Sequence, residues 1–282
     1  NWPMETFNAQ VKSGLNKTKQ MLWVITAFWL ILLGWMMYRI HRYSTVLNKK
    51  VDELAVSNQE LDDFAYIASH DLKEPLRGIH NYSSIIIEDY EDKLDSEGTD
   101  KLTTLIRLTK RMENIINDLL YFSRVGRTDI NREKTDLNHL IAEITDSLQF
   151  SISENQVTCR IPETLPIVSC DHVRLKEVFY NLLTNAIKYN DKEHKWIEIG
   201  YQDEDRTKSS PIFYVRDNGI GIKENHVGKV FKLFKRLHGR NKFGGGTGAG
   251  LTIVKKIIQK HGGEIWLEST PGQGTTFYFT IN

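Results

Sequence analysis

His70 has neighbours that suit a reactive imidazole: Asp71 follows it directly, and Pro75 lies a little more than one helical turn further on. The Asp71 carboxylate can orient one ring nitrogen and accept its proton as a general base, which leaves the other nitrogen as a nucleophile. An imidazole of ordinary pKa is largely neutral near pH 7 and can attack phosphorus without a strong base. An isolated histidine is more commonly an ordinary surface residue. Here the acidic neighbour, and a proline that can bend the helix, favour a reactive position.

Two amides and an ammonium group repeat at helical spacing further along the chain. Asn181, Asn185 and Lys188 follow an i, i+4, i+7 pattern and therefore share one helix face, with Glu177 one turn earlier. An amide oxygen is a hard ligand, so this face could hold a magnesium–phosphate group, with phosphate and water oxygens completing the octahedron. A solvated helix face is the alternative.

Two glycine-rich segments accompany this face. Asp217 opens the first, which runs to Gly221; its carboxylate can accept from the exocyclic amine of a base, and the glycines let backbone approach a flat ring. The second, residues 244–251, leads into an expected helix, whose N-terminal amides and dipole suit phosphate. Alone, the first segment could be an ordinary turn and the second a flexible linker.

Two stretches earlier in the chain have the repeat of paired helices. In the first, seam positions alternate at spacings of four and three through Leu47, Val51, Leu54, Asn58, Leu61, Ala65, Ala68 and Leu72. The second helix, expected over 96–124, has the seam Leu102, Leu105, Thr109, Met112, Ile116 and Leu119. These seams predict a coiled coil between two chains and two antiparallel helices per chain, which would pair into a four-helix bundle. His70 lies off the seam and is expected to face solvent.

The pattern changes from about residue 131 to short strands and amphipathic helices. Strands are expected over 132–135, 157–161, 167–170, 196–202, 212–216, 264–268 and 275–280, and helices over 137–150, 172–189 and 251–261. Asp171 stands where the second of these helices needs an N-cap. Helices interspersed with mostly antiparallel strands predict an α/β sandwich.

An apolar run near the start, Met21–Tyr38, contains 18 residues without a charge. At about 1.5 Å per residue it is about 27 Å long, close to the ~30 Å hydrocarbon core of a bilayer. Trp23 and Trp35 lie near its ends, where aromatic rings suit the headgroup layer. The run is long and lacks a small-residue cleavage site, so a signal peptide fits less well, and a buried core helix is the other alternative. The run predicts a transmembrane helix.

Composition excludes several classes of protein. The 282 residues carry 37 basic and 36 acidic side chains, so there is no basic excess to attract nucleic acid. The chain is 40% hydrophobic and 10% aromatic, which is too much for a disordered protein. Cys159 and Cys170 are its only cysteines, which excludes a disulfide scaffold and a four-thiolate zinc site; both are expected to be reduced thiols.

Taken together, in this order and spacing, the motifs resemble the four boxes of sensor histidine kinases. The histidine box surrounds His70, the asparagine box is 181–189, and the glycine boxes are 217–221 and 246–251, with a phenylalanine box at 230–234. Residues 62–77, and Leu237–Arg240 through the glycines, look most like the kinase module of phytochrome-type and related cyanobacterial or bacterial sensors. The resemblance covers about 47–282.

The resemblance implies a multidomain α and α/β chain. Its parts are a transmembrane helix, a dimeric helical-hairpin phosphoacceptor domain that forms a four-helix bundle, and an α/β sandwich ATP-binding domain of the gyrase, chaperone and histidine kinase type. The expected boundaries are 1–20 for an extracytoplasmic tail or the end of a missing sensor, 21–40 for the membrane helix, 41–61 for a coiled-coil signalling helix, 62–126 for dimerisation and histidine phosphotransfer, and 131–282 for ATP binding.

The resemblance also implies an activity, namely Mg-ATP-dependent autophosphorylation of His70 followed by phosphotransfer to an aspartate of a response regulator. The implied partners are a second copy of the chain, the receiver domain of that regulator and a membrane, with no nucleic acid. The implied location is the inner or plasma membrane, crossed once, with the kinase part in the cytoplasm.

Roles for single residues follow from the resemblance as well. His70 is the phosphoacceptor and Asp71 its general base or orienter; Asn185 coordinates Mg²⁺, and Asp217 reads the adenine amine. The other expected ATP-binding residues are Asn181, Lys188, Tyr189, Gly219, Gly221, Arg236, Gly246, Thr247, Gly248, Gly250 and Leu251.

Two departures from the family pattern matter. Glu74 stands where many members of the commonest subfamily carry Thr or Asn, a residue thought to orient water for dephosphorylating the regulator, so weak phosphatase activity is expected. Asn190 replaces a hydroxyl residue at the end of the asparagine box, which should be a mild change. Two rival functions stay open: an ATP-driven clamp of the gyrase and chaperone type, which needs no histidine box, and a pseudokinase that relays signals by coiled-coil conformation alone.

Overall fold

A computed structural model of the chain describes residues 2–125, 130–202, 211–236 and 246–282. Its contacts divide the chain into two units, Asn1–Leu61 and Asp62–Asn282. The helices are α1 (Trp2–Asp89), the 3₁₀ helix η1 (Glu91–Lys93), α2 (Ser96–Val125), α3 (Leu137–Ser147), α4 (Gln149–Glu154), α5 (His172–Lys188), α6 (Glu224–Val227) and α7 (Gly250–Lys260). The strands are β1 (Glu133–Asp136), β2 (Val157–Arg160), β3 (Ile167–Cys170), β4 (Lys195–Gln202), β5 (Ile212–Asp217), β6 (Ile265–Thr270) and β7 (Gly274–Thr280).

The N-terminal unit is helical throughout its described part, because α1 begins at Trp2. One stretch of it, Gly14–Ser57, is long and apolar enough to cross a membrane by length and composition, a criterion that buried core helices and signal sequences also meet. The described side chains of this stretch are exposed. Leu47, Val51 and Leu54 of the expected coiled-coil seam are among them, while the side chains of Asn58, Leu61 and Ala65 lie outside the described set. The coiled coil between chains therefore stays a prediction.

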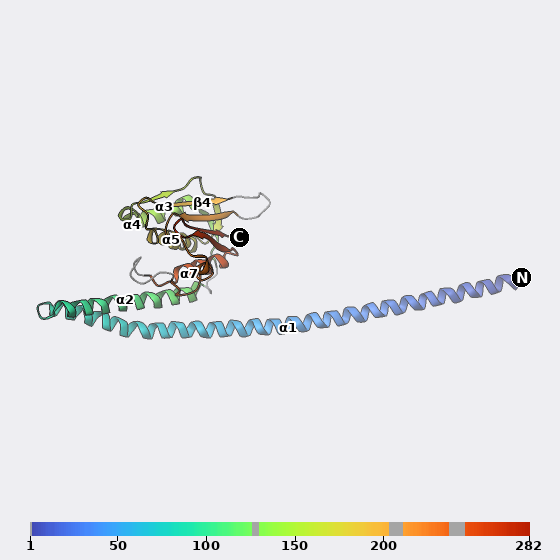
Figure 1. The fold of residues 1–282 in the computed structure, drawn as a ribbon. Helices are drawn as coiled ribbons and strands as arrows, with labels where there is room; N and C mark the ends of the chain where they lie inside the picture. The colour runs from blue at the N-terminus through green and yellow to red at the C-terminus, as the bar shows by residue number, and fades with distance from the viewer. Residues whose placement is uncertain (1, 126–129, 203–210, 237–245) are drawn as a thin grey trace. The chain divides into compact units, whose positions relative to one another are not determined.

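The second unit begins with a helical hairpin. α1 continues through Pro75 to Asp89, and α2 runs back alongside its C-terminal part (Figure 1). The start of α2 is capped, because the Asp95 carboxylate accepts from the backbone N–H of Gly98 at 2.7 Å. The hairpin pairs through contacts such as Thr109 with His80, whose Oγ1 and Nδ1 atoms are 3.4 Å apart.

The seam expected on α2 divides into two rows. Thr109 and Ile116, seven residues apart, are buried within the single chain. Leu105 and Met112, also seven apart, stay exposed at 43% and 48%. The single chain therefore buries one row of the seam and leaves the other uncovered.

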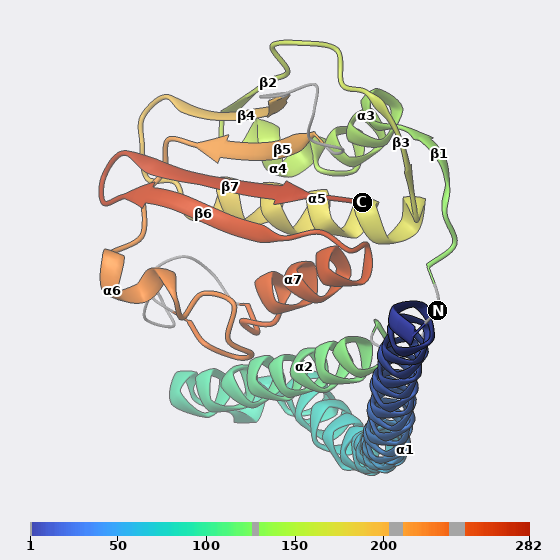
Figure 2. The same ribbon diagram turned by 90° about the vertical axis from the view of Figure 1, so that its right-hand side faces the viewer.

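The rest of the unit is the expected α/β sandwich. The five-stranded sheet has the order β2-β4-β5-β7-β6, with β2 parallel to β4 and the other neighbours antiparallel, and β1 pairs with β3 in a separate two-stranded ribbon. In Figure 2 β4, β5, β7 and β6 lie across the front and α5 runs behind them. The core lies between these layers, where the rings of Phe179 on α5 and Phe213 on β5 flank Phe279 on β7, with centroids 5.4 and 5.5 Å away. Burying each ring contributes about 3 kcal/mol.

Most element boundaries match those expected to within one or two residues, and the N-cap on α5 is confirmed: the Asp171 side chain accepts from the N–H of Arg174 at 3.1 Å. The single helix expected over 137–150 is wrong. Leu148 leaves the helical conformation with φ −98° and ψ 3°, which ends α3 at Ser147 and lets α4 start in a new direction. The Leu148 side chain is buried in the core, so packing decides this break.

Candidate functional site

A cavity of about 340 Å³ opens in the sandwich domain and is lined by α5, the ends of β5 and β7, and the turn before α7. The expected site residues that line it are Asn181, Asn185, Lys188, Tyr189, Asp217, Gly221, Arg236, Gly246, Thr247, Gly248, Gly250 and Leu251. Three segments far apart in the sequence thus meet around one hollow. Of the expected set for this site, only Gly219 is not among the described lining residues.

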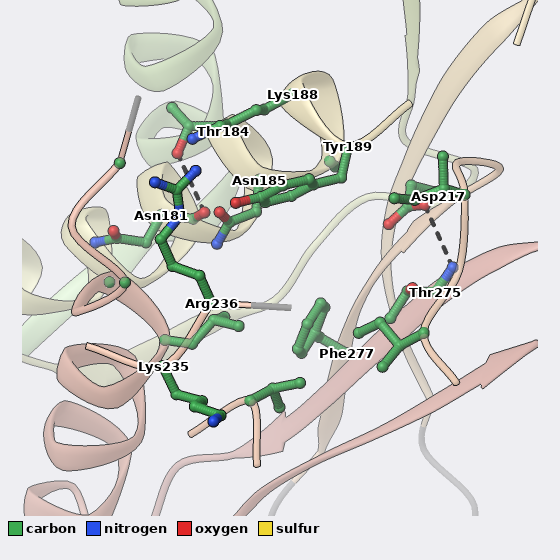
Figure 3. Close-up of a pocket in the computed structure, with 18 of the residues that line it drawn as sticks. Asn181, Thr184, Asn185, Lys188, Tyr189, Asp217, Lys235, Arg236, Thr275 and Phe277 are labelled. Atoms are coloured by element: carbon green, nitrogen blue, oxygen red, sulfur yellow. Dashed lines mark hydrogen bonds between the residues drawn. The ribbon is translucent and has the colours of Figure 1, made fainter. Parts of the chain in front are cut away.

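Asp217 lies at one end of the cavity (Figure 3). Its Oδ1 accepts from the backbone N–H groups of Gly219 at 2.8 Å and Thr275 at 3.3 Å, which fixes the plane of the carboxylate. Burial raises the pKa of Asp217 to about 6, while the two backbone donors oppose this rise. The apolar residues Ile220, Ile222, Val230 and Phe277 also line the cavity. An acceptor at the end of an apolar slot suits a flat ring with an exocyclic amine.

The opposite end of the cavity is polar and cationic. Asn181, Asn185, Lys188 and Arg236 converge there in Figure 3, and the Tyr189 ring lies between them and Asp217. Burial lowers the pKa of Lys188, and the positive charge of Arg236 lowers it further. Two cations that disfavour one another in a partly buried site are stabilised by an anion. This end therefore suits a polyphosphate.

The glycines of the site are needed for close approach between protein segments. A Cβ on Gly219 would lie 2.3 Å from the Tyr189 carbonyl oxygen, and one on Gly221, where φ is +68°, would lie 2.1 Å from that of Thr270. In the second box, a Cβ on Gly250 would lie 2.5 Å from Asn181 Oδ1. Gly219 thus allows the end of α5 to approach the turn after β5, while the expected approach of these glycines to a flat ring stays a prediction.

His70 lies elsewhere, on the exposed surface of the hairpin, and its side chain is 72% exposed. Its Nδ1 is 3.4 Å from Asp71 Oδ1, so the carboxylate lies beside the ring as expected. His70 lines a second, smaller cavity with Lys73, Asn117, Leu120, Tyr121 and Arg124. The two cavities share none of their described lining residues.

Family models account for both regions. Residues 60–128 match the His Kinase A (phospho-acceptor) domain, and residues 170–282 match the histidine kinase-, DNA gyrase B- and HSP90-like ATPase. The two matches follow one another in the order expected from the sequence and contain His70 and the large cavity respectively. The chain belongs to the sensor histidine kinases.

Relatives of this histidine kinase include phytochrome-type sensors. It is 58% identical over 84% of its length to cyanobacterial phytochrome B of Nostoc sp. and 37% identical over 86% to the phytochrome-like protein Cph1 of Synechocystis sp.. It is also 32% identical over 85% to the sensor protein kinase WalK of Staphylococcus aureus. The chain spans about a third of the two cyanobacterial proteins, 32% in each case, and 57% of WalK.

Solved structures agree with the fold of the histidine kinase. Full-length ShkA in complex with AMPPNP superposes with a TM-score of 0.59 at 22% identity, over 78% of this chain and 45% of ShkA. The Acinetobacter baumannii histidine kinase AdeS superposes with a TM-score of 0.54 at 21% identity, over 73% of this chain and 94% of AdeS.

Some residues line the cavity that the sequence motifs did not indicate. Thr184, Lys235, Thr275 and Phe277 are lining residues outside the expected set. Thr275 and Phe277 lie on β7, and pairing of β7 with β5 in antiparallel register places them beside Asp217 and Val215. Only knowledge of the strand order could have found them, because they lie about sixty residues away in the sequence.

Glu177 is expected on the same helix face as Asn181, yet it contacts the hairpin of the kinase. The Tyr121 hydroxyl on α2 donates to the Glu177 carboxylate and accepts from Arg174 Nη1 at 2.5 Å. Burial raises the pKa of Glu177, against the effects of its hydrogen bond from Tyr121 and of the positive charge of Arg174. Nothing in the helical spacing of α5 distinguishes this contact from the cavity contact of Asn181.

Asn190 links the end of the asparagine box to the first glycine box. Its side-chain amide donates to Asn218 Oδ1 at 2.8 Å, and its own oxygen accepts from the N–H of Lys192 at 3.1 Å. Asn190 is buried, so it fastens the end of α5 to the turn that carries Asp217. The departure from a hydroxyl residue is therefore accommodated by a local hydrogen-bond network.

Proposed function

We propose that this chain is the kinase module of a membrane-anchored sensor histidine kinase. It binds ATP in the large cavity, transfers the γ-phosphoryl group to His70, and passes it on to an aspartate in the receiver domain of a response regulator. The observation that carries the proposal is the pairing of Asp217 at one end of the cavity with Lys188, Arg236 and the asparagines at the other. In ATP the adenine amine and the phosphate chain lie at opposite ends of the molecule. A site for ATP therefore requires an acceptor at one end and cations at the other.

The polar end of the cavity fits a magnesium ion held largely by the nucleotide. Mg²⁺ prefers oxygen ligands and is usually bound by few protein groups together with phosphates and water. The described residues contain no cluster of three His, Cys, Asp or Glu side chains that could hold a metal, while the amides of Asn181 and Asn185 line this end. Asn185 would supply an amide oxygen. When bound, the ion neutralises charge on the phosphates and on the leaving group.

The protein groups around His70 determine the proton balance of the transfer. With a proton on Nδ1 facing Asp71 Oδ1, Nε2 keeps its lone pair and attacks the γ-phosphorus. The N–P bond forms while the bond from the γ-phosphorus to the β–γ bridging oxygen breaks, and ADP leaves. Asp71 accepts the Nδ1 proton, which gives a neutral phosphorylated imidazole. In the second transfer the N–P bond breaks as an aspartate oxygen of the regulator bonds to phosphorus, and Asp71 returns the proton to Nδ1, which restores His70.

Labelling the full chain in detergent with γ-labelled ATP and magnesium tests the proposal. We expect a label that is acid-labile and alkali-stable, and that is lost in His70→Gln and Asn185→Ala. His41→Gln and Asn155→Ala are matched controls, since His41 lies in the N-terminal unit and the Asn155 side chain donates to Ser151 O at the end of α4. Bound nucleotide without label would support a pseudokinase, and ATP hydrolysis that survives His70→Gln would support an ATP-driven clamp.

The membrane anchor is supported by the uncharged run Met21–Tyr38 within the longer apolar stretch of α1. We expect the chain to stay in the membrane fraction after alkaline extraction, and Leu30→Arg with Leu33→Arg to release it, because an arginine near the bilayer centre costs about 2.5 kcal/mol or more. Leu47→Arg with Leu54→Arg, in the expected coiled-coil helix that follows the run, is the matched control. Release of the wild-type chain by alkali would contradict the anchor.

A further inference from the structure

Several described side chains join helix α2 to the ATP-binding domain, and three of these contacts bear on the nucleotide cavity and its surroundings. Lys256 Nζ on α7 donates to the Phe122 carbonyl oxygen at 2.6 Å and lies 3.9 Å from the centre of the Phe122 ring. Tyr121 bonds Glu177 and Arg174 on α5 as described above. The third contact differs from these two because it reaches the lining of the nucleotide cavity itself.

In this third contact the Thr247 hydroxyl donates to Asp118 Oδ2 on α2. Thr247 lines the cavity, in the glycine turn that leads into α7, and its Oγ1 also accepts from the N–H of Ala249 at 3.3 Å. The backbone amides of a glycine turn and of a helix N-terminus attract anions. The Asp118 carboxylate thus brings a negative charge and acceptor oxygens to the turn where nucleotide phosphates are expected.

The charges around Asp118 also disfavour phosphates near this turn. The Asp118 charge adds to the burial that raises the pKa of Glu177 on α5, so the two carboxylates lie close enough to repel one another. Asn181, which lines the phosphate end, follows Glu177 by one helical turn and donates to its carbonyl oxygen at 2.9 Å. Phosphates entering the cavity bring further negative charge to the same place, and like charges repel.

We propose that Asp118 is a phosphate-mimicking latch. Its contact with Thr247 competes with the phosphates of a bound nucleotide, so that nucleotide binding weakens the attachment of the ATP-binding domain to α2. His70 and the nucleotide cavity share no described lining residue, so transfer within one chain requires the ATP-binding domain to move. The latch thereby restricts the movement until a nucleotide is present. This inference rests on the proposed function, since it takes the cavity to be an ATP site.

Nucleotide affinity tests the latch on the full chain in detergent. Asp118→Asn removes the charge at nearly constant shape, and Glu113→Gln on the same helix, where Glu113 pairs with Lys110 at 2.8 Å, is the matched control. The probes are AMPPNP with magnesium and adenosine, which has no phosphates. We expect Asp118→Asn to bind AMPPNP roughly five- to ten-fold tighter, a typical coupling between two sites. Adenosine affinity should not change, and Glu113→Gln should match the wild type with both probes.

A structural readout tests the release directly. Spin labels at Thr103→Cys on α2 and Glu264→Cys on the ATP-binding domain, both exposed positions, report the distance between the two parts in a chain carrying Cys159→Ala and Cys170→Ala. We expect AMPPNP to broaden the distance distribution, adenosine to leave it narrow, and Asp118→Asn to broaden it without any nucleotide. A distribution unchanged by AMPPNP would overturn the latch.

The outcomes separate the two proposals. A wild-type chain that binds neither AMPPNP nor adenosine contradicts the ATP site itself. If the wild type binds both and Asp118→Asn leaves AMPPNP affinity unchanged or weaker, the latch is wrong while the kinase proposal stands. If Asp118→Asn raised the affinity for adenosine by the same factor as that for AMPPNP, the substitution would have loosened the domain in general. That result would also contradict the latch.

Discussion

At the scale of single residues, Asp217 combines the adenine-binding role proposed for it with a cost in stability. Its pKa rises from 3.8 in the unfolded chain to about 6 because the folded protein buries it. The folded state therefore binds more protons between these values, and the contribution of this group to the free energy of unfolding falls as the pH rises from about 4 to about 6. The folded chain is more stable when this buried carboxyl is protonated than when it is ionised. Retention of such a destabilising group is typical of a functional residue.

Nucleotide affinity should follow the ionisation of Asp217. In the proposed function the carboxylate accepts from an adenine amine, and protonation below about pH 6 places a donor there instead, so AMPPNP affinity should fall with an apparent pKa near 6. Asp217→Asn should weaken AMPPNP binding roughly ten-fold or more, because a hydrogen bond to a charged group is lost. It should also raise the melting temperature at pH 7.5. Calorimetric titration from pH 5 to 8 checks the first two expectations, with Asp191→Asn, an exposed position, as control; a flat profile would contradict the role of Asp217.

Glu74 is the basis of a second prediction, which concerns phosphatase activity toward the response regulator. It is exposed on α1 one turn after His70, where the resemblance places a water-orienting Thr or Asn in other members. A carboxylate there repels an incoming hydroxide-like water and the phosphoryl group. Decay of a phosphorylated receiver domain should therefore hardly accelerate when the chain and ADP are added, and Glu74→Thr should accelerate it more than Glu91→Thr. Strong acceleration by the wild type would contradict this prediction.

At the scale of elements, the site depends on how α5 and α7 are held against each other. His261, just after α7, is fully buried, and its Nδ1 lies 2.9 Å from the Ile257 carbonyl oxygen. Its Nε2 accepts from the backbone N–H of Asp171, the N-cap of α5, at 3.1 Å. One neutral imidazole thus ties the end of α7 to the start of α5, and those two helices carry the glycine turn and the asparagines of the cavity.

His261→Ala should lower the free energy of unfolding by about 2–3 kcal/mol, because it leaves a cavity and an unpaired N–H. Burial lowers the pKa of His261 from 6.5, so its contribution is complete above that value and is lost as the pH falls through the lower value of the folded state. Urea unfolding at pH 5.5 and 7.5 checks both points. The variant should depend less on pH than the wild type and than His194→Ala, an exposed control, and an identical pH dependence would refute the tie.

At the scale of the whole molecule, the hairpin leaves an apolar stripe uncovered. Leu72, Ile79 and Ile86 on α1 follow one another at intervals of seven and are all exposed, as are Leu105 and Met112 on α2. A soluble surface does not usually present apolar residues at heptad spacing on two adjacent helices. The stripe supports the homodimer implied by the family, in which a second hairpin would cover it.

Ile79→Glu together with Met112→Glu should therefore separate the dimer. Each buried apolar side chain contributes about 1.5 kcal/mol or more and occurs in both copies, so the dissociation constant should rise by at least a hundred-fold. Light scattering of the detergent-solubilised chain after size exclusion checks this. Thr103→Glu, an exposed α2 position off the stripe, should leave the dimer intact, and a dimer that survives the double substitution would place the interface elsewhere.

The sequence by itself determined the motifs, the elements that carry them and the family, because each of these depends on local order: capping at Asp171, helical spacing from Asn181 to Lys188, and glycines before α7. Tertiary structure decided what local order cannot encode. Strand pairing brings Thr275 and Phe277 to Asp217, core packing of Leu148 ends α3 early, and Glu177 turns to Tyr121 although it shares the periodicity of Asn181. The contact of Asp118 with Thr247 joins residues 129 positions apart, and no spacing rule indicates it. Such contacts arise from how whole surfaces meet, and a surface is assembled only when the chain has folded.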